Sequence, residues 1–293
     1  MIAQTRREIV ALFGQPVSEN PTEAMLEAAF RHHGLAWVYH SFEVPPRELE
    51  AAVKAASTLG FRGFHCTLPH KEAVTRYLDV IGRSAVEIGA VNCVIRTPEG
   101  FVGENTDGRG FLDALDDDAL AEASVLLFGA GGAARAIAVE LVLAGVRTIT
   151  IVNRTSARAE LLAAHLDRVA GRHRRPLNVR VGSWGSALAV DPSTDLVVNA
   201  TPVGLYPNVD VALPVAVESL LPSMIVADVI ANPPRTLLLE AAETAGCVTV
   251  DGVEMLVNQG ARSLKYWAGI EADKNVMRAA VMDRLGLKDT ARR

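Results

Sequence analysis

The stretch that decides the fold runs from residue 124 to residue 155 and reads SVLLFGAGGAARAIAVELVLAGVRTITIVNRT. An apolar run at 124–128 leads directly into a cluster of glycines, and a long apolar helical segment follows. Gly145 ends that segment, and a β-branched run comes next. This order predicts a complete strand–helix–strand unit with two parallel strands.

The loop between the first strand and the helix fits the pattern Gly-x-Gly-x-x-Ala. Glycines permit the tight turn, and missing side chains let backbone N–H groups approach a pyrophosphate at the helix N-terminus. A small-residue turn without any ligand can match the same pattern, but the strand–helix context favours dinucleotide binding. The residues expected to form this part of the site are Gly129, Ala130, Gly131, Gly132 and Ala133.

The end of the second strand bears on the choice of cofactor. An NAD site usually offers Asp or Glu to the ribose hydroxyls at this point. This chain has Asn153, Arg154 and Thr155 instead, and then Arg158. A carboxylate would repel a 2′-phosphate, whereas an arginine can hold one through charge-assisted hydrogen bonds. The arginines could also be ordinary surface charges of the next helix, but their chemistry favours NADP over NAD.

Strand-like and helix-like runs alternate along the rest of the chain. This alternation predicts an α/β protein with mainly parallel sheets, and a length of 293 residues suggests two domains. Helical runs are expected after Pro21 and Pro46, and a hairpin over 91–103 is expected to turn at 98–100. Further strands are expected at 8–14, 37–44, 63–68, 195–201, 224–230 and 247–252, and two last helices at 253–270 and 273–285.

Composition excludes several classes of function. The net charge is -5, and the 29 Lys+Arg and 34 Asp+Glu are interspersed, which disfavours nucleic-acid binding. No secretory signal or membrane span is evident, so a cytoplasmic protein without a membrane partner is expected. Cys66, Cys93 and Cys247 are far apart and read as free thiols. The seven histidines are scattered, and no metal is expected.

A nicotinamide cofactor would give two upstream residues a role. Oxidation of an alcohol by hydride transfer also releases a proton, so an acid/base must lie beside the substrate. Lys71 can serve if a partly desolvated cleft lowers its pKa and a carboxylate orients it. Asp107 is the candidate carboxylate, at the junction of the two expected units. The residues alone leave the alternatives open: a lysine on a helix surface and an aspartate that caps a helix.

Taken together, these stretches resemble the shikimate dehydrogenase family, which includes shikimate and quinate dehydrogenases. The resemblance runs over nearly the whole chain, in the family's order. The matching stretches are TLPHK, GAVNC, ENTDGRGF, GAGGAARA, NRTSAR, NATPVGL, DVIANPPRT and DGVEMLVNQGA. It implies a substrate domain over 1–107, a Rossmann nucleotide domain over 108–255, and C-terminal helices over 256–293 that return to the first domain.

The resemblance also implies roles for single residues. Lys71 matches the catalytic lysine and Asp107 its partner aspartate. The residues that match those binding the hydroxyls of the substrate ring are Thr67, Asn92 and Gln259. Arg154 and Thr155 match contacts to the adenosine phosphate, and Thr201 and Pro202, followed by Val203, match the segment near the nicotinamide. The implied function is NADP-dependent oxidation of shikimate or a related cyclic polyol, as in aromatic amino acid biosynthesis, by a monomer or homodimer.

The chain departs from the family at the end of the pocket that holds the substrate carboxylate. The usual Ser-x-Ser-Pro loop keeps Ser18, has Asn20 for the second serine, and is shortened. His65 stands where the family generally has Asn, and Ala231 where Tyr is usual. Ser18, Asn20 and His65 are expected at the substrate, and shikimate is expected to be a poor one. The alternatives are an enzyme for another ring alcohol or amino analogue, and a non-catalytic sensor of quinate-type ligands, which the retained Lys71 and Asp107 disfavour.

Overall fold

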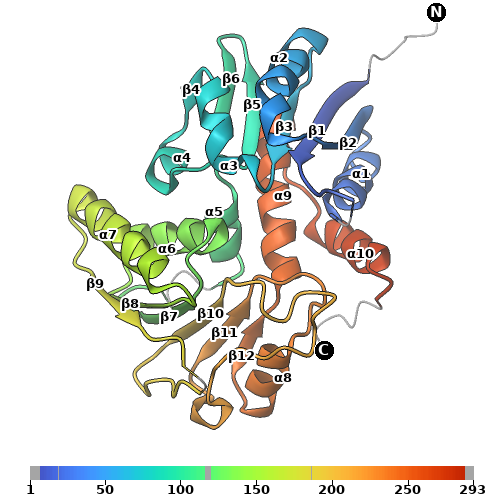
Figure 1. Ribbon diagram of the computed structural model, residues 1–293. Coiled ribbons are helices and arrows are strands. Elements are labelled where there is room, and N and C mark those ends of the chain that lie inside the picture. The colour runs from blue at the N-terminus through green and yellow to red at the C-terminus, as the bar shows by residue number, and fades with distance from the viewer. Residues whose placement is uncertain (1–6, 19, 116–119, 186, 288–293) are drawn as a thin grey trace, which may run out of the picture. The chain divides into compact units, whose positions relative to one another are not determined.

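The computed structural model describes residues 7–18, 20–115, 120–185 and 187–287 (Figure 1). The chain divides into two compact units: unit 1 comprises Met1–Thr106 and Val257–Arg293, and unit 2 comprises Asp107–Leu256. The predicted domain boundaries, after residues 107 and 255, fall next to these divisions. The outer ends of the predicted domains, 1–6 and 288–293, lie outside the described residues.

Unit 1 is built on a mixed sheet with the strand order β2-β1-β3-β5-β6-β4. β1 pairs in parallel with β2 and β3, while β5 is antiparallel to both β3 and β6. The predicted hairpin is the β5–β6 pair, and its reversal of chain direction makes this sheet mixed. The strands are β1 (Glu8–Gly14), β2 (Trp37–Glu43), β3 (Gly63–Cys66), β4 (Val80–Ile81), β5 (Cys93–Thr97) and β6 (Gly100–Glu104).

Helices flank this sheet, and two of them begin at the predicted prolines. Pro21 immediately precedes the first helix, and Pro46 opens a short 3-10 turn that runs into the second. The helices are α1 (Thr22–His32), α2 (Leu49–Leu59), α3 (His70–Ala73), α4 (Arg83–Ile88), α9 (Gly252–Ala268) and α10 (Lys274–Arg284). α10 packs against α1, so the C-terminal helices complete unit 1 (Figure 1).

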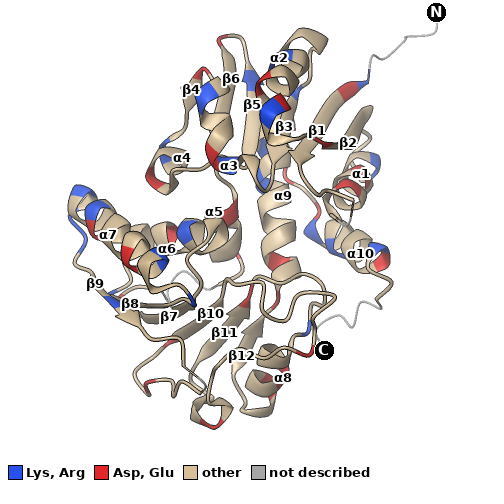
Figure 2. Cartoon of the chain, in the orientation of Figure 1, with Lys and Arg blue, Asp and Glu red and all other residues tan. Residues whose placement is uncertain are grey.

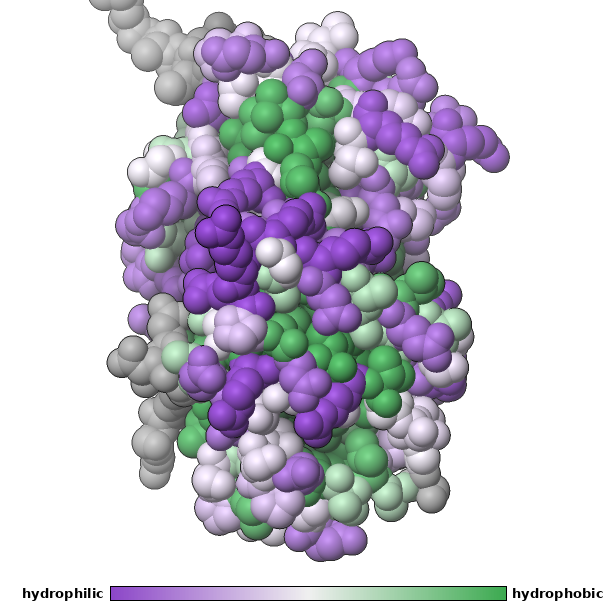
Figure 3. Space-filling model, turned by 90° about the vertical axis from the view of Figure 1, so that its left-hand side faces the viewer, coloured by the Kyte–Doolittle hydropathy of each residue, from purple (hydrophilic) through white to green (hydrophobic). Residues whose placement is uncertain are grey.

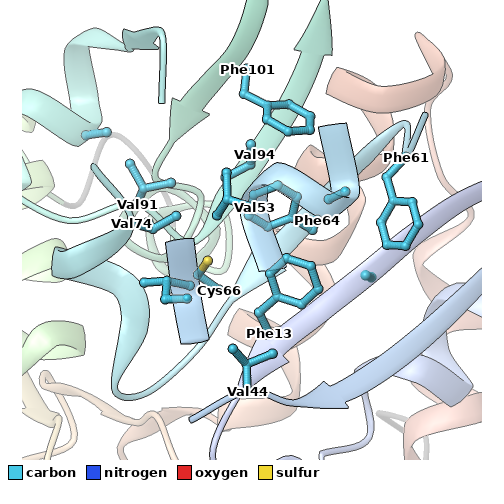
Figure 4. Packing of buried hydrophobic residues seen from close by; sticks show 14 residues of the cluster. Phe13, Val44, Val53, Phe61, Phe64, Cys66, Val74, Val91, Val94 and Phe101 are labelled. Atoms are coloured by element: carbon cyan, nitrogen blue, oxygen red, sulfur yellow. The ribbon is translucent and has the colours of Figure 1, made fainter. Parts of the chain in front are cut away.

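Aromatic side chains form the centre of a hydrophobic core in unit 1. The rings of Phe13 and Phe64 stack with their centroids 4.7 Å apart, and Phe101 meets Phe64 edge to face at 5.3 Å (Figure 4). Each is at most 4% exposed. Burial of a side chain of this size contributes about 1.5–3 kcal/mol, so this cluster fixes β1, β3 and β6 relative to one another.

Unit 2 has a wholly parallel sheet with the order β12-β11-β10-β7-β8-β9. Its strands are β7 (Ser124–Phe128), β8 (Thr148–Val152), β9 (Asn178–Gly182), β10 (Leu196–Asn199), β11 (Ile225–Asp228) and β12 (Val248–Val250). Its helices are α5 (Asp107–Leu112), α6 (Gly132–Ala144), α7 (Ser156–His173) and α8 (Leu237–Thr244). Strand order changes direction at β7, and ligands of such sheets bind beyond the carboxyl ends of the strands at that point.

Charge and hydropathy are mixed over the surface of the described residues. Acidic and basic residues are interspersed along the elements of each unit (Figure 2). Figure 3 shows one face on which hydrophilic side chains surround apolar patches. Among the helices that the structure describes, none has the length and apolar character needed to cross a bilayer. Cys66, Cys93 and Cys247 form no disulfide.

Candidate active site

Unit 2 contains a pocket of about 240 Å³ at the point where its strand order changes direction. Every residue expected to bind the cofactor lines it except Gly132 and Ala133, which open the adjoining helix α6. The lining residues are Gly129, Ala130, Gly131, Asn153, Arg154, Thr155, Arg158, Trp184, Ala200, Thr201, Pro202 and Val203. Trp184 and Ala200 were not predicted: Trp184 lies outside the recognised stretches, and Ala200 lies within NATPVGL but was given no role.

The glycine loop leaves room for a ligand at the N-terminus of α6. Gly129 has φ +117°, and a Cβ there would lie 2.6 Å from the carbonyl oxygen of Ala200, so no other residue fits without a shift. A Cβ on Gly131 or Gly132 would meet nothing within 4 Å. This open space beside the first N–H groups and the positive end of the helix dipole suits a pyrophosphate.

The end of β8 supplies positive charge and no negative charge. Asn153 donates a hydrogen bond from Nδ2 to the carbonyl of Thr155 at 2.9 Å, which shapes the turn that presents Arg154 and Arg158. Both arginines are exposed and line the pocket, and none of its described lining residues is acidic. The donor set therefore fits the 2′-phosphate of NADP.

A buried carboxylate orders the segment 201–203 on the other side of this pocket. Asn199 accepts hydrogen bonds from the N–H and hydroxyl of Thr201 at 3.0 and 2.7 Å, and donates to Asp228 at 3.0 Å. Thr236 and the N–H of Ile230 also donate to Asp228. Burial raises the pKa of Asp228 to about 6, against the lowering effect of these hydrogen bonds. Asn199 and Asp228 lie in recognisable stretches, NATPVGL and DVIANPPRT, but sequence reasoning gave them no role.

In unit 1, two residues expected at the substrate hydroxyls belong to one buried polar group. Asn92 Nδ2 lies 3.0 Å from Thr106 Oγ1 and 3.4 Å from Gln259 Oε1, and Asn92 Oδ1 accepts from the N–H of Thr106 at 2.7 Å. These residues precede β5, follow β6 and lie on α9. The structure thus brings together Asn92 and Gln259 from distant parts of the chain.

His65 lies behind this group rather than at a surface. It is 4% exposed, with Nδ1 2.8 Å from the Tyr39 hydroxyl and Nε2 2.7 Å from the Ser263 hydroxyl. The ring also packs against Trp267, with centroids 4.6 Å apart. Sequence reasoning missed Tyr39 and Ser263, because contacts over 26 and 198 residues leave no local signal.

The main chain around Lys71 is well fixed. Thr67 N donates to the carbonyl of Phe13 at 3.0 Å, and the carbonyls of Thr67 and Lys71 accept from His70 N and Val91 N, each at 2.8 Å. Lys71 is half-buried in the single turn of α3. Burial raises the pKa of the Cys66 thiol, while the positive charge of Lys71 opposes that rise, so Lys71 lies near the end of β3.

Asp107 is placed by close packing of α5 on α6 within unit 2. A Cβ on Gly108 would lie 2.3 Å from the carbonyl oxygen of Ala136, so this glycine allows the approach of the two helices. Arg109 Nε forms an ion pair with the buried Glu140 at 3.1 Å. Asp107 is buried at the first position of α5, where a carboxylate also interacts favourably with the helix N-terminus.

Ser18 and Asn20 line a separate pocket of unit 1, of about 570 Å³. The polar lining is rich in carboxylates, with Arg284 as the only lining cation that the structure describes. The lining residues are Val17, Ser18, Asn20, Glu23, Ala24, Glu27, Ser41, Glu43 and Arg284. Glu43 accepts from Val17 N at 2.9 Å, Glu23 accepts from Ser41 N and Oγ, and Asn20 Oδ1 accepts from Thr22 N at 2.9 Å. Asn20 thus orders the start of α1.

Across the described parts of the chain, no three His, Cys, Asp or Glu side chains come together as a metal site would require.

Family models match three parts of the chain. The shikimate dehydrogenase substrate binding domain matches residues 12–94. The shikimate / quinate 5-dehydrogenase model matches residues 114–178. The shikimate 5'-dehydrogenase C-terminal domain matches residues 252–282.

Individual proteins match over nearly the full length. A shikimate dehydrogenase (NADP(+)) of Methanopyrus kandleri is 45% identical, over 94% of this chain and 96% of that protein. The ligand-free 5-ketofructose reductase of Gluconobacter sp. strain CHM43 is 43% identical with a TM-score of 0.89, over 95% of this chain and 99% of that one. Shikimate 5-dehydrogenase of Thermus thermophilus, in complex with NADP(H) and shikimate, is 32% identical with a TM-score of 0.82, over 94% and 99%.

Proposed function

The chain belongs to the shikimate dehydrogenase family, and we propose that within this family it acts on a neutral polyhydroxylated ketone and its alcohol. It is an NADP-dependent oxidoreductase acting on a CH–OH group, of the shikimate dehydrogenase type. In the oxidative direction the carbon gives a hydride to NADP⁺ and the hydroxyl gives a proton to a base. Reduction by NADPH reverses both transfers.

Lys71 is proposed as the acid/base, and Asp107 as the carboxylate that orients it. The fixed main chain of α3 supports a single position for Lys71, and the packing of Gly108 and Arg109 on α6 does the same for Asp107. A neutral lysine accepts the hydroxyl proton in oxidation, and an ammonium returns it in reduction. Thr67, Asn92 and Gln259 are proposed to bind the substrate hydroxyls.

The pocket of unit 2 is proposed to hold NADP, which supplies or accepts the hydride. Gly129 to Ala133 would face the pyrophosphate, and Arg154 and Thr155, supported by Asn153 and Arg158, would face the 2′-phosphate. Thr201 to Val203 would lie along the nicotinamide, held in place by the Asn199–Asp228 pair.

The proposal of a neutral substrate is carried by the acidic surroundings of Ser18 and Asn20. The family resemblance puts a substrate carboxylate near this loop. Here the loop shares a pocket with Glu23, Glu27 and Glu43, and Arg284 is the one cation among the described lining residues. A carboxylate close to three others is repelled, whereas a hydroxyl can donate hydrogen bonds to them. Ala231, where the family usually has Tyr, offers no side-chain donor to a carboxylate.

The 5-ketofructose reductase named above supports this substrate class, because its named substrate is a polyhydroxylated ketone without a carboxylate. Shikimate remains the second candidate, favoured by the 45% identity to the Methanopyrus kandleri enzyme. Sequence identity over the whole chain, 45% to one protein and 43% to the other, does not distinguish the two substrates. We therefore rank the substrates by the charges around Ser18 and Asn20.

Four substrates test the proposal: 5-ketofructose and 3-dehydroshikimate with NADPH, and shikimate and quinate with NADP⁺. The expected result is a kcat/KM for 5-ketofructose at least tenfold above that for 3-dehydroshikimate. An equal or higher value for 3-dehydroshikimate contradicts the neutral-substrate proposal. Ligand binding without turnover of any of the four contradicts the assignment as an enzyme and favours a sensor.

Partners and location are also proposed from the sequence. We propose a cytoplasmic monomer or homodimer that binds neither nucleic acid nor membrane, on the basis of a net charge of -5 with interspersed charges and of free cysteines.

A further inference from the structure

The hydrogen bonds around His65 have a definite direction. Ser263 Oγ donates to the carbonyl of Gln259 at 2.9 Å, because a carbonyl can only accept. We assign the one proton of the Ser263 hydroxyl to that bond. With this assignment His65 Nε2, 2.7 Å away, is the donor to Ser263. His65 Nδ1 then accepts from the Tyr39 hydroxyl at 2.8 Å. In this assignment His65 is a neutral imidazole in the Nε2–H form.

The surroundings of His65 hold this arrangement in place. Tyr39 is fully buried, and burial raises the pKa of its hydroxyl well above the usual value, so the hydroxyl keeps the proton that it donates. Trp267 packs against the imidazole and donates from Nε1 to the carbonyl of Val94 at 2.9 Å. The imidazole therefore has little freedom to rotate.

The other end of this chain of hydrogen bonds is the group expected to bind substrate hydroxyls. Ser263 lies one helical turn after Gln259 on α9, and its Oγ is 3.4 Å from Thr106 Oγ1. Gln259 Oε1 in turn lies 3.4 Å from both Thr106 Oγ1 and Asn92 Nδ2. Movement of Ser263 would displace the turn of α9 that carries Gln259.

We propose that His65 is a positioning residue for substrate recognition: through Ser263 it sets the place of Gln259 against Asn92 and Thr106. It acts through these residues and not by touching the substrate, in contrast to the direct contact expected from the sequence. The proposal rests on the proposed function in one respect, namely that Asn92 and Gln259 bind the substrate hydroxyls.

Two substitutions of His65 test the hydrogen bond from Nε2 to Ser263, because one can keep this donor and the other cannot. Gln at position 65 can place its Nε2 near that of the histidine and keep the donor to Ser263, whereas Asn is too short to reach it. We expect His65→Asn to raise KM about tenfold, as the loss of roughly 1.4 kcal/mol would, with kcat and the Kd of NADP little changed. His65→Gln should stay within about threefold of wild type. KM is measured for 5-ketofructose with NADPH or, if the panel selects it, for shikimate with NADP⁺.

Ser263→Ala is the matched variant on α9. It should raise KM as His65→Asn does, and the double variant should be no worse than either single one, because both break the same link. Additive effects, an unchanged KM in His65→Asn, or a fall in melting temperature with no change in KM would overturn the proposal.

A readout without substrate keeps this inference separate from the proposed function. Long-range ¹H–¹⁵N correlation of the histidine side chains in the NADP-bound protein should show one Nε2–H tautomer at pH 7 that disappears in His65→Gln. An Nδ1–H tautomer or an imidazolium at this residue would overturn the directed chain of hydrogen bonds. Failure to reduce 5-ketofructose would not affect that measurement.

Discussion

Lys71 shows how a common surface residue type acquires a specific place. Main-chain hydrogen bonds tie its turn to two neighbours: Thr67 N donates to Phe13 of β1, and the Lys71 carbonyl accepts from Val91 N, just before β5. Its positive charge lowers the pKa of the buried Cys66 thiol at the end of β3, against the rise caused by burial. A flexible lysine on an open helix would have neither constraint, so its position on a rigid turn supports a role in proton transfer.

We expect Lys71→Ala to lose about 10²–10⁴-fold in kcat, because general acid–base catalysis contributes that much. Its melting temperature and its Kd for NADP should match those of wild type. Lys54→Ala is the control, since Lys54 is an exposed lysine on α2 that pairs with Glu50. Near wild-type turnover of Lys71→Ala at neutral pH would exclude Lys71 as the acid/base.

Asp107→Asn distinguishes the two roles considered for this carboxylate. If Asp107 orients Lys71, kcat should fall by a similar factor while the melting temperature changes little. If it mainly stabilises the start of α5, the melting temperature should fall by several degrees with little kinetic defect, since such contacts contribute about 0.5–2 kcal/mol. Steady-state kinetics and thermal unfolding of the same sample separate these outcomes.

Arg154→Ala tests how the pocket of unit 2 selects its cofactor. A hydrogen bond to a charged group contributes about 1.5–3 kcal/mol, so NADP binding should weaken by roughly ten- to a hundredfold and NAD binding should hardly change. Arg168→Ala, an exposed arginine of α7 that does not line the pocket, serves as the control. Equal weakening of both dinucleotides, measured by calorimetry, would mean that Arg154 contacts something other than the 2′-phosphate.

At the scale of elements, the sequence predicted those whose pattern is local. The β7–α6–β8 unit and the β5–β6 hairpin were confirmed, because apolar runs and glycine turns mark them directly. β9 was not predicted, since it is a short edge strand with mostly exposed residues and lacks an apolar run. α8 was also not predicted, although Thr236 caps its N-terminus by accepting from Leu239 N.

The candidate site residues divide in the same way, into those marked by a local sequence pattern and those that only the folded chain brings together. Residues in compact motifs, such as Gly129, Gly131 and Arg154, were predicted from the sequence as a site, and they line one pocket. Tyr39, Ser263, Asn199 and Asp228 were not, because their partners lie on other elements and only the folded chain brings them together. Local patterns encode turns and helix faces but not the hydrogen bonds that cross a sheet.

The carboxyl end of β11 in unit 2 carries Asp228, whose titration makes the stability of the fold depend on pH. The pKa of Asp228 is raised to about 6, above its unfolded value of 3.8, so between these two pH values the folded state binds more protons than the unfolded one. Its contribution to stability is therefore greatest at low pH and falls as pH rises toward 6. From pH 5 to pH 7.5 the loss amounts to about 1.4 kcal/mol.

The Asp228→Asn variant lacks this titrating carboxyl, so the difference between wild type and the variant isolates the effect of Asp228. The free energy of unfolding of wild type relative to the variant should decline by about 1.4 kcal/mol between pH 5 and pH 7.5. Urea denaturation of both proteins at the two pH values measures the difference and cancels the titration of all other groups. A difference that is constant with pH, or that grows, would show that the Asp228 carboxyl is not shifted upward.

At the scale of the whole molecule, the proposed substrate choice rests on departures from the family that lie far apart in the chain. Asn20 lies in unit 1 and Ala231 in unit 2, and both differ from the family's usual residues. The residues proposed for catalysis and for binding hydroxyls, in contrast, match the family's motifs. The combination suits a substrate that shares the reacting alcohol of shikimate but not its carboxylate, so specificity should change without loss of the basic chemistry.

Restoring the family residues should therefore improve shikimate specifically. In Asn20→Ser with Ala231→Tyr, two hydroxyl donors become available, and hydrogen bonds to a charged group contribute about 1.5–3 kcal/mol each. We expect kcat/KM for shikimate to rise by roughly tenfold or more, chiefly through KM, while that for 5-ketofructose falls or stays level. Leu161→Ala, which alters an exposed side chain of α7, controls for general effects of substitution. If wild type already oxidises shikimate with a kcat/KM in the usual range of about 10⁴–10⁸ M⁻¹s⁻¹ and the double variant does no better, the two positions do not select against the carboxylate.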